Sequence, residues 1–231
     1  GTLVVVESTI PPGTMEREIV PVLEQSSGLS ANGDFFAACC PERVMPGKLL
    51  ANLVTCSRVV GGWTPDAGRV GAALYATLTG GDVDVTDCLT AELVKTTENA
   101  YRDVQIAFAN EVALLCEDYG ADVYEVRTLV NKSPHRDMHM PGAGVGGHCI
   151  PKDPWLLVAN AASSTPVRLI PAARAVNDSM PLHIAQLVAG ALAENGRDLA
   201  TSRIAVLGYA YLENSDDTRN SPSAAVVGCL Q

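Results

Sequence analysis

Residues 2–13 read Thr2-Leu-Val-Val-Val6-Glu-Ser-Thr9-Ile-Pro-Pro-Gly13, an apolar run followed by a turn. A short run of apolar, mostly β-branched residues is typical of a strand buried on both faces of a parallel sheet. We therefore expect a strand over residues 3–7 and, after the turn, a helix over residues 15–25. This order of strand, turn and helix indicates an α/β fold.

The same alternation continues as far as residue 85. Further strands are predicted over residues 35–40, 58–61 and 83–85, with a loop over 41–48 and a helix over 65–79. We expect this region to be the second half of a Rossmann-like, doubly wound sheet whose first half lies outside these residues.

Residues 89–119 predict one long amphipathic helix, because side chains with apolar character recur at steps of three and four. These positions are Leu93, Thr97, Tyr101, Val104, Phe108, Val112, Leu115 and Tyr119. Such a helix is roughly 40 Å long or more, so we expect it to bridge domains or to pair with its copy in a dimer. Lys95 and Asn99 are four residues apart and project from one face.

The second half of the chain predicts helices over residues 122–131 and 171–195, a strand over 203–208 and a helix from Ser223. We divide the chain into three parts. Residues 1–86 form the end of a Rossmann-like domain, residues 87–200 a central helical domain, and residues 201–231 the start of a second α/β domain.

A glycine-rich loop carries one cysteine in the sequence Pro141-Gly-Ala-Gly-Val-Gly146-Gly-His-Cys149-Ile-Pro-Lys152-Asp153-Pro. Glycines remove side-chain bulk, so a ligand can approach the thiol closely. Lys152 and Asp153 supply charges that tune a thiol and orient water. We interpret the loop as a site of covalent catalysis by Cys149; the alternative is a cysteine that serves as a small buried apolar residue.

Two other interpretations of this loop are weaker. Gly142, Gly144 and Gly147 match the dinucleotide spacing G-x-G-x-x-G, but the residues before them do not resemble a buried strand, so we reject a dinucleotide turn. A zinc site would use His135, His139, His148 and Cys149, but the prolines on either side disfavour a helix that could present them. We predict no metal.

Composition excludes several classes of protein. The chain has 231 residues, of which 47% are hydrophobic, and a net charge of −10, which disfavours nucleic acid and anionic membranes as partners. No apolar run is long enough to span a membrane. Seven cysteines, odd in number and scattered, favour reduced thiols in a cytoplasm. Both ends of the chain are apolar runs, from which we expect a piece of a longer polypeptide.

Five separated motifs resemble the UDP-glucose/GDP-mannose 6-dehydrogenase family, in order and spacing along essentially the whole chain. They are Glu7-Ser-Thr9-Ile-Pro-Pro-Gly13, Pro41-Glu42-Arg43-Val-Met-Pro-Gly47, Ala91-Glu-Leu-Val-Lys95-Thr-Thr-Glu-Asn99, Gly146-Gly-His-Cys149-Ile-Pro-Lys-Asp153 and Asp216-Asp-Thr-Arg219-Asn-Ser-Pro-Ser223. The resemblance implies an NAD-dependent, two-step oxidation of the C6 alcohol of a nucleotide sugar to a carboxylate. It also implies two dinucleotide-type domains on either side of a helical dimerisation region.

The resemblance assigns roles to residues of this chain. Cys149 would attack the C6 aldehyde to give a thiohemiacetal, and a second oxidation would give a thioester that water hydrolyses. Lys95 and Asn99 would face the developing oxyanion. Thr9, Glu42 and Asp153 would hold or activate the water. Cofactor contacts would come from Thr9, Glu42, Lys152 and Arg219, and substrate contacts from Arg43, Lys95, Asn99, Arg136 and Gly146.

Within the family, the motifs resemble the enzymes of N-acetylhexosamines more than those of UDP-glucose. His135-Arg136 resembles an element through which an arginine reaches the sugar nucleotide of the partner subunit in a homodimer or larger homo-oligomer. The preferred substrate is UDP-N-acetyl-D-mannosamine, with UDP-glucose as the alternative.

Two departures from the family pattern lead us to expect little or no activity from these 231 residues alone. The dinucleotide fingerprint is not among them, and Leu212 stands where the family usually has a lysine. Two other functions remain open. A thiol acyltransferase or hydrolase would also use an exposed cysteine, but it needs a histidine within reach of Cys149. A non-catalytic, dimerising α/β module is the second.

Overall fold

The computed structural model describes residues 1–231 except 32, 45, 46 and 48. The chain forms two compact units. Unit 1 contains residues 1–99 and 153–165, and unit 2 contains residues 100–152 and 166–231. The predicted boundaries near residues 86 and 200 stay predictions.

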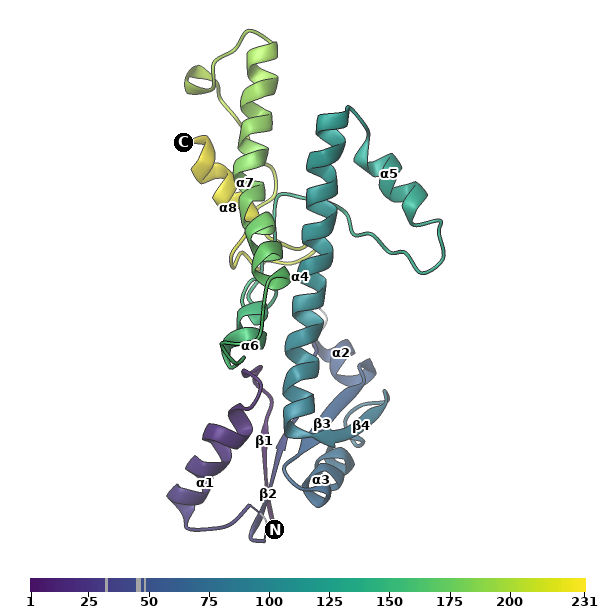
Figure 1. The fold of residues 1–231 in the computed structure, drawn as a ribbon, viewed down its shortest axis with the longest axis vertical. Coiled ribbons are helices and arrows are strands. Elements are labelled where there is room, and N and C mark those ends of the chain that lie inside the picture. Colours follow the sequence, from purple (N-terminus) through teal and green to yellow (C-terminus); the bar gives the residue numbers. More distant parts are fainter. Residues whose placement is uncertain (32, 45–46, 48) are drawn as a thin grey trace. The chain divides into compact units, whose positions relative to one another are not determined.

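A four-stranded sheet, counted over the described residues, forms the centre of unit 1 (Figure 1). Its strands follow the order of the chain: β1 (Thr2–Val6), β2 (Phe35–Cys39), β3 (Arg58–Gly62) and β4 (Val83–Asp87). β1 pairs with β2, and β3 with β4, in parallel. These strands confirm the four predicted ones to within two residues at each end.

β2 and β3 pair antiparallel, which the sequence did not predict for a doubly wound sheet. Parallel neighbours need a crossover of about a dozen residues or more, usually a helix packed on the sheet. In the described part of this connection the one helix is α2 (Leu49–Thr55), and none of the residues of α2 is buried. β3 therefore starts at the edge where β2 ends. Of the predicted loop over residues 41–48, positions 45, 46 and 48 lie outside the described residues.

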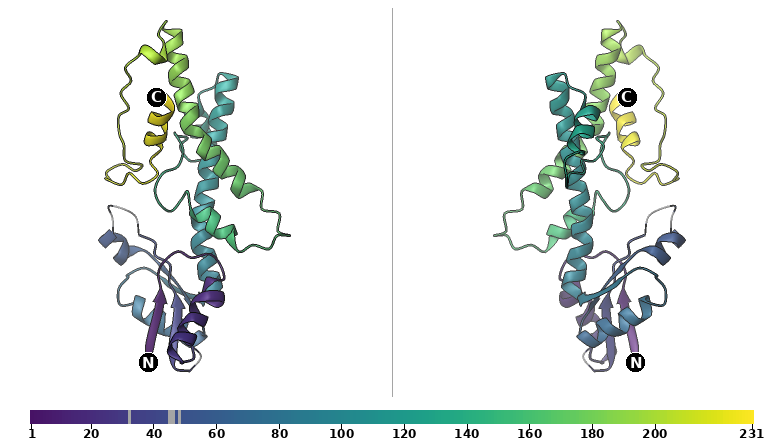
Figure 2. Two further views of the ribbon diagram at one scale, coloured as in Figure 1. Left: turned by 90° about the vertical axis from the view of Figure 1, so that its left-hand side faces the viewer. Right: turned by 90° about the vertical axis from the view of Figure 1, so that its right-hand side faces the viewer.

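The core of unit 1 lies on both faces of the sheet because side chains alternate along each strand. Phe35, Ala37 and Cys39 of β2 pack on one face with Met15 and Val20, which belong to η1 (Met15–Ile19) and α1 (Val20–Ser27). Ala38, Cys40 and Val60 pack on the other face with Tyr75, at the end of α3 (Pro65–Tyr75). Figure 2 shows these helices from two further sides.

α3 ends four residues before the predicted position. Its start is as expected, because Thr64 caps it by accepting a hydrogen bond from the N–H of Ala67. The hydroxyl of Thr79 donates to the carbonyls of Val54 and Cys56 instead of continuing the helix, at 3.2 and 2.8 Å. Threonine often competes with helical bonding in this way.

The long helix α4 (Cys88–Tyr119) confirms the prediction for residues 89–119, but the face it buries is a different one. Its buried face carries small and polar residues, among them Glu92, Thr96, Asp103 and Asn110. Several large side chains of the predicted apolar stripe are exposed, namely Tyr101 (63%), Phe108 (61%), Leu115 (46%) and Tyr119 (81%). The stripe therefore does not form the core of this chain.

Unit 2 is helical. It contains the second part of α4 together with α5 (Val123–Val130), α7 (Leu169–Glu194), η2 (Leu199–Thr201) and α8 (Pro222–Leu230). α5, α7 and α8 confirm the predicted helices. The short η2 and α6 (Asp153–Ala159), which follows the cysteine loop in unit 1, were not predicted. The strand predicted for residues 203–208 is wrong. Within the described chain this segment pairs with no other strand, and its Leu207 is 92% exposed.

Among the helices that the structure describes, none combines the length and apolar character needed to cross a membrane.

Candidate functional site

The loop that carries Thr9 is held in place through its backbone. It follows β1, and Thr9 itself is half-buried. The buried carboxylate of Glu92, on α4, accepts hydrogen bonds from the N–H groups of Gly13 (2.5 Å) and Met15 (2.8 Å). On the other side, Asn160 donates to the carbonyl of Pro12 at 2.9 Å. Burial raises the pKa of Glu92, while the two backbone N–H groups act in the opposite direction.

Asn99 and Asp153 meet directly, although they are far apart in the sequence. The amide of Asn99, on α4, donates to Oδ2 of Asp153 at 2.5 Å, and Asp153 is the first residue of α6. The carboxylate of Asp153 is fully buried. Lys95 lies about one helical turn before Asn99 on the same helix and is half-buried. Three of the predicted catalytic residues therefore belong to one part of unit 1.

Glu42 and Arg43 follow β2, and both already have partners. The carboxylate of Glu42 accepts from the N–H of Val44 and lies 3.8 Å from Arg58. Arg43 forms an ion pair with Glu98 of α4 and donates to Ser57 at 3.2 and 3.3 Å. A substrate that binds Arg43 would have to displace or share these contacts.

Cys149 is exposed, at the end of a loop without helix or strand. Two glycines of this loop, Gly144 (φ 115°) and Gly147 (φ 86°), have backbone angles that favour glycine. The N–H of Lys152 donates to the carbonyl of Cys149 at 3.1 Å and closes a turn after the thiol. This geometry confirms that the glycine spacing is not a dinucleotide turn, because no strand precedes it.

A buried polar network holds the start of the cysteine loop. The side-chain oxygen of Asn110, on α4, accepts from the N–H of Gly142 at 2.9 Å, and its amide donates to Asn177, on α7, at 2.9 Å. Asn177 donates to the carboxylate of Asp103 at 2.8 Å, and Arg174 donates to the same oxygen at 2.5 Å. Burial raises the pKa of Asp103 against the opposing effect of Arg174.

Arg219 forms an ion pair with Asp217. Its guanidinium donates from Nε to both carboxylate oxygens, at 2.9 and 3.1 Å, and from a terminal nitrogen at 2.5 Å. Hydrogen bonds from Arg219 lower the pKa of Asp217 to about 2. Leu212, in the same segment, is 42% exposed. The predicted cofactor contact is therefore a cation that is already neutralised within its own loop.

The remaining predicted substrate residues lie in the same irregular regions of unit 2. Arg136 is exposed and donates to the carbonyl of Pro134 at 3.1 Å. Gly146 lies against Tyr211, because a Cβ built on Gly146 would be 2.5 Å from the Cβ of Tyr211. Burial, followed by the neighbouring Asp217 carboxylate, raises the pKa of Tyr211.

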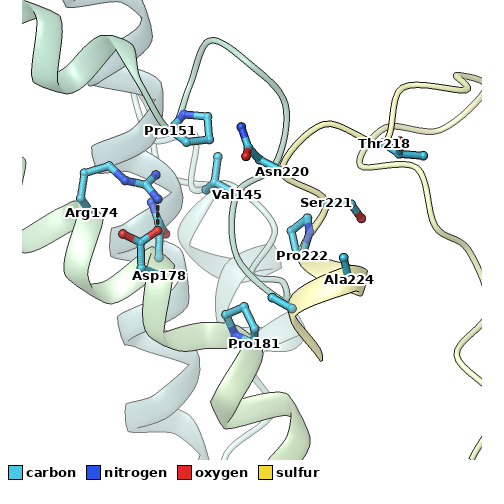
Figure 3. A pocket seen from close by; sticks show the side chains of 12 residues that line it. Val145, Pro151, Arg174, Asp178, Pro181, Thr218, Asn220, Ser221, Pro222 and Ala224 are labelled. Carbon is cyan, nitrogen blue, oxygen red and sulfur yellow. Dashed lines mark hydrogen bonds and ion pairs between the residues drawn. The ribbon is translucent and has the colours of Figure 1, made fainter. Parts of the chain in front are cut away.

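A cavity of about 390 Å³ borders the cysteine loop (Figure 3). Val145 and Pro151, on either side of Cys149 in the sequence, line it together with Pro181 and Pro222. Among the described residues that line it, the guanidinium is that of Arg174, which is paired with Asp103 and Asp178. A site for a diphosphate needs cations that are available to the ligand, so this cavity does not fit one.

The polar side chains of unit 1 suit the nicotinamide and ribose of a nicotinamide dinucleotide better than its pyrophosphate. Thr9 and Glu42 follow the carboxyl ends of β1 and β2, where ligands of α/β sheets bind. A pyrophosphate would need N–H groups at the helix that follows the strand. There the N–H groups of Gly13 and Met15 already donate to Glu92. Thr9 and Glu42 thus suit a ribose or nicotinamide, and this helix start does not suit the pyrophosphate.

The structure brings together part of the predicted site. Thr9, Glu42, Arg43, Lys95, Asn99 and Asp153 belong to unit 1, whereas Gly146, Cys149, Lys152, Arg136 and Arg219 belong to unit 2. The convergence of Cys149 with the residues of unit 1 stays a prediction. No group of three or more His, Cys, Asp or Glu residues within the described ranges could hold a metal ion.

Sequence reasoning gave no role to Glu92, Asn110, Tyr211 or Asn220. Glu92 and Asn110 had a detectable signal, since polar residues recur at steps of four and seven on α4, on the side away from the apolar stripe. Tyr211 and Asn220 had none, because their partners are glycines distant in the sequence.

Residues 1–79 match the NAD binding domain of the UDP-glucose/GDP-mannose dehydrogenase family, and residues 89–179 match its central domain. The chain belongs to this family.

Among the curated proteins, the chain is 47% identical over 231 residues to the UDP-N-acetyl-D-mannosamine dehydrogenase of Pyrococcus horikoshii, covering 100% of this chain and 54% of that protein. A solved structure of the UDP-D-ManNAc dehydrogenase from this organism has a TM-score of 0.93 at 46% identity, covering 99% of this chain and 54% of the other. The NDP-N-acetyl-D-galactosaminuronic acid dehydrogenase of Methanosarcina mazei Go1 has a TM-score of 0.91 at 41% identity, covering 99% and 51%. The chain thus spans about half the length of these relatives.

Proposed function

We propose that these residues serve an NAD-dependent oxidation of a nucleotide sugar at C6, from alcohol to carboxylate, with UDP-N-acetyl-D-mannosamine as the preferred substrate. The observation that carries the proposal is the hydrogen bond between Asn99 and Asp153. It joins two residues to which the family motifs give catalytic roles. Asp153 also lies four residues after Cys149 in the sequence, so the motif of the thiol contributes directly to this pair.

Cys149 is the nucleophile in this proposal. Its thiolate adds to the carbonyl carbon of the C6 aldehyde, and the carbonyl oxygen becomes an oxyanion that is protonated to the thiohemiacetal. NAD, when bound, accepts the hydride in each of the two oxidations. The thioester that follows is cleaved by water, which frees the thiol and leaves the carboxylate.

Asn99 and Lys95 stabilise the oxyanion. The amide of Asn99 has two hydrogens; one is engaged with Asp153, which fixes the plane of the amide and leaves the other for the oxyanion. Lys95, about one turn earlier, adds a fixed positive charge. Asp153 has a second task, because a buried carboxylate is suited to take a proton from the attacking water. Thr9 and Glu42 orient this water.

The names of two relatives support the choice of sugar. The name of one relative gives UDP-N-acetyl-D-mannosamine, and the name of the other gives a nucleotide of N-acetyl-D-galactosaminuronic acid, so both names contain a nucleotide-linked N-acetylated sugar. UDP-glucose remains the alternative substrate. We also propose a location in the cytoplasm, because all seven cysteines are unbridged.

We further propose that the protein is a homodimer that uses the exposed stripe of α4. Tyr101, Phe108 and Leu115 are seven residues apart, the spacing with which helices pair along their length. Large exposed apolar side chains in a row mark interfaces. Arg136 would then contact the sugar nucleotide of the other subunit. Phe108→Glu is expected to give a monomer in light scattering, whereas Val22→Glu on α1, at a residue that is 57% exposed, leaves the dimer intact.

The test of the reaction is the formation of NADH by a longer polypeptide that contains these 231 residues together with a dinucleotide-binding strand, turn and helix. UDP-N-acetyl-D-mannosamine, UDP-N-acetyl-D-galactosamine and UDP-glucose are compared. We expect two NADH per mannosamine nucleotide and at least about a thousandfold loss of complete turnover in Cys149→Ser. Cys229→Ser, at the other exposed cysteine, is the control and should keep full activity. If the protein oxidises UDP-glucose alone, the proposed substrate is wrong and UDP-glucose takes its place. If it hydrolyses an ester without NAD, the proposed oxidation is wrong and the protein is a hydrolase.

A further inference from the structure

The cysteine loop is held at a second point, at Gly147, two residues before Cys149. The N–H of Gly147 donates to the carbonyl of Arg219 at 2.8 Å. The carbonyl of Gly147 accepts from the side-chain amide of Asn220 at 2.9 Å. Both polar groups of the Gly147 backbone are therefore bound by two consecutive residues of a segment more than seventy positions away in the sequence.

Both sides of this contact have unusual backbone geometry. Gly147 has a φ of 86° and Asn220 a φ of 50°, and asparagine is among the few residues other than glycine that adopt such angles readily. A Cβ built on Gly147 would lie 2.9 Å from the ring of Tyr211. The hydroxyl of Ser221, the residue after Asn220, donates to the carbonyl of Tyr209 at 2.6 Å and so links the two ends of the segment 209–221. The segment 209–221 thus contacts the cysteine loop at Gly147 and restricts its backbone.

We propose that Asn220 is a positioning residue for the nucleophile. By holding the carbonyl of Gly147, its amide restricts the two peptide units that lead to Cys149, so that the thiol keeps one place. This inference rests on the function proposed above and deepens it, since it assigns a second task to the motif that carries Arg219. Asn220 acts through Gly147 and does not touch the substrate.

The location of Asn220 makes the proposal testable. The residue is exposed, and its side chain makes one hydrogen bond to Gly147. Removing this side chain should therefore not unfold the chain. Asn214 offers a matched control. It lies in the same segment, is exposed and has a similar φ of 55°, but no hydrogen bond between its side chain and the cysteine loop is found among the described residues.

The experiment compares Asn220→Asp and Asn220→Gly with Asn214→Asp and Asn214→Gly, each in the longer polypeptide of the NADH test. Aspartate keeps the size of the side chain and loses the donor, whereas glycine keeps the backbone angle and loses the side chain. Hydrogen exchange of the peptide that contains Gly147 reports on the loop without substrate or NAD. Steady-state kinetics with the nucleotide sugar then report kcat and KM separately.

We expect both Asn220 variants to exchange about tenfold faster at Gly147 and to lose about tenfold in kcat, with KM within about twofold of the parent. Iodoacetamide should alkylate Cys149 in the Asn220 variants at least as fast as in the parent, because a small reagent reaches the thiol in any orientation of the loop. The Asn214 variants should match the parent in all three measurements.

Unchanged exchange in the Asn220 variants would show that the Asn220 side chain does not restrain the Gly147 peptide, and would overturn the positioning role. Faster exchange with unchanged kcat would overturn the positioning role, as would an equal loss in the Asn214 variants. A parent protein that turns over no nucleotide sugar would refute the proposed function, while the exchange data still decide whether Asn220 restrains the cysteine loop.

Discussion

Two loops carry predicted catalytic side chains, and α4 holds both through their backbones, by different chemistry. In unit 1, the carboxylate of Glu92 accepts from Gly13 and Met15 at the end of the Thr9 loop. In unit 2, the amide of Asn110 accepts from Gly142 at the start of the Cys149 loop. One anchor can carry a charge and titrates, whereas the other is neutral and depends on further buried partners.

This difference indicates what each loop is sensitive to. The Thr9 loop is anchored to α4 by one ionisable side chain, so the strength of this anchor should change with pH. The Cys149 loop depends on a chain of contacts from Asn110 through Asn177 to Asp103 and Arg174, so it should respond to changes remote from the thiol. A hydrogen-bonded network of this kind is costly to leave partly satisfied.

The largest effect is expected from Arg174→Met, which breaks the base of the Asn110 network. It leaves the carboxylate of Asp103 buried without its cation, and such a change costs about 3–5 kcal/mol of unfolding free energy. Urea denaturation measures the loss. The control is Asp178→Asn, which removes the exposed partner of Arg174 and should cost about 1 kcal/mol or less. Equal losses of unfolding free energy in both variants would show that the buried Arg174–Asp103 pair contributes no more than the exposed Arg174–Asp178 pair.

Glu92→Ala should follow, with a loss of about 2–4 kcal/mol, because two buried N–H groups lose their acceptor. Hydrogen exchange should become faster at Gly13 and Met15 and remain unchanged at Gly142. Glu111→Ala, at an exposed position of the same helix, is the control. Protection that persists at Met15 in the Glu92 variant would contradict the anchor.

Asn110→Ala is expected to cost about 1–3 kcal/mol, since the buried side-chain oxygen of Asn177 loses its donor and the N–H of Gly142 loses its acceptor. Exchange should become faster at Gly142, with Gly13 and Met15 unaffected. Loss of protection at all three positions would show that the two loops do not have separate anchors.

The smallest effect is a dependence on pH that should distinguish the two anchors. Burial raises the pKa of Glu92 in the folded chain, with Arg17 opposing and Glu16 adding to the shift. Its contribution is therefore full below the pKa of the unfolded chain and is lost as pH rises through the higher folded value. Glu92→Gln should lose stability less steeply with rising pH than the parent, in denaturation series from pH 4 upward. Parallel curves would exclude titration of this anchor.

Short sequence patterns correctly predicted those strands and helices that are specified by residues close to one another in the sequence. The β-branched run at residues 2–6, the Thr64–Pro65 start of α3 and the periodicity of residues 89–119 each specify an element through near neighbours. The strand predicted for residues 203–208 failed for the opposite reason. A strand exists only with a partner, and none pairs with this segment in the described chain. The antiparallel start of β3 likewise depends on where the preceding connection packs.

The sequence by itself determined the chemistry that the chain can offer: a thiol in a glycine loop, a lysine and an asparagine one turn apart on a helix, and motifs that define the family. Only the tertiary structure decided which side chains meet. It paired Asn99 with Asp153, bound Gly147 to Asn220, and turned the polar face of α4 inward while the apolar stripe stayed exposed. The physical reason is that buried polar groups need partners, and partners distant in the sequence come within hydrogen-bonding reach only once the chain has folded.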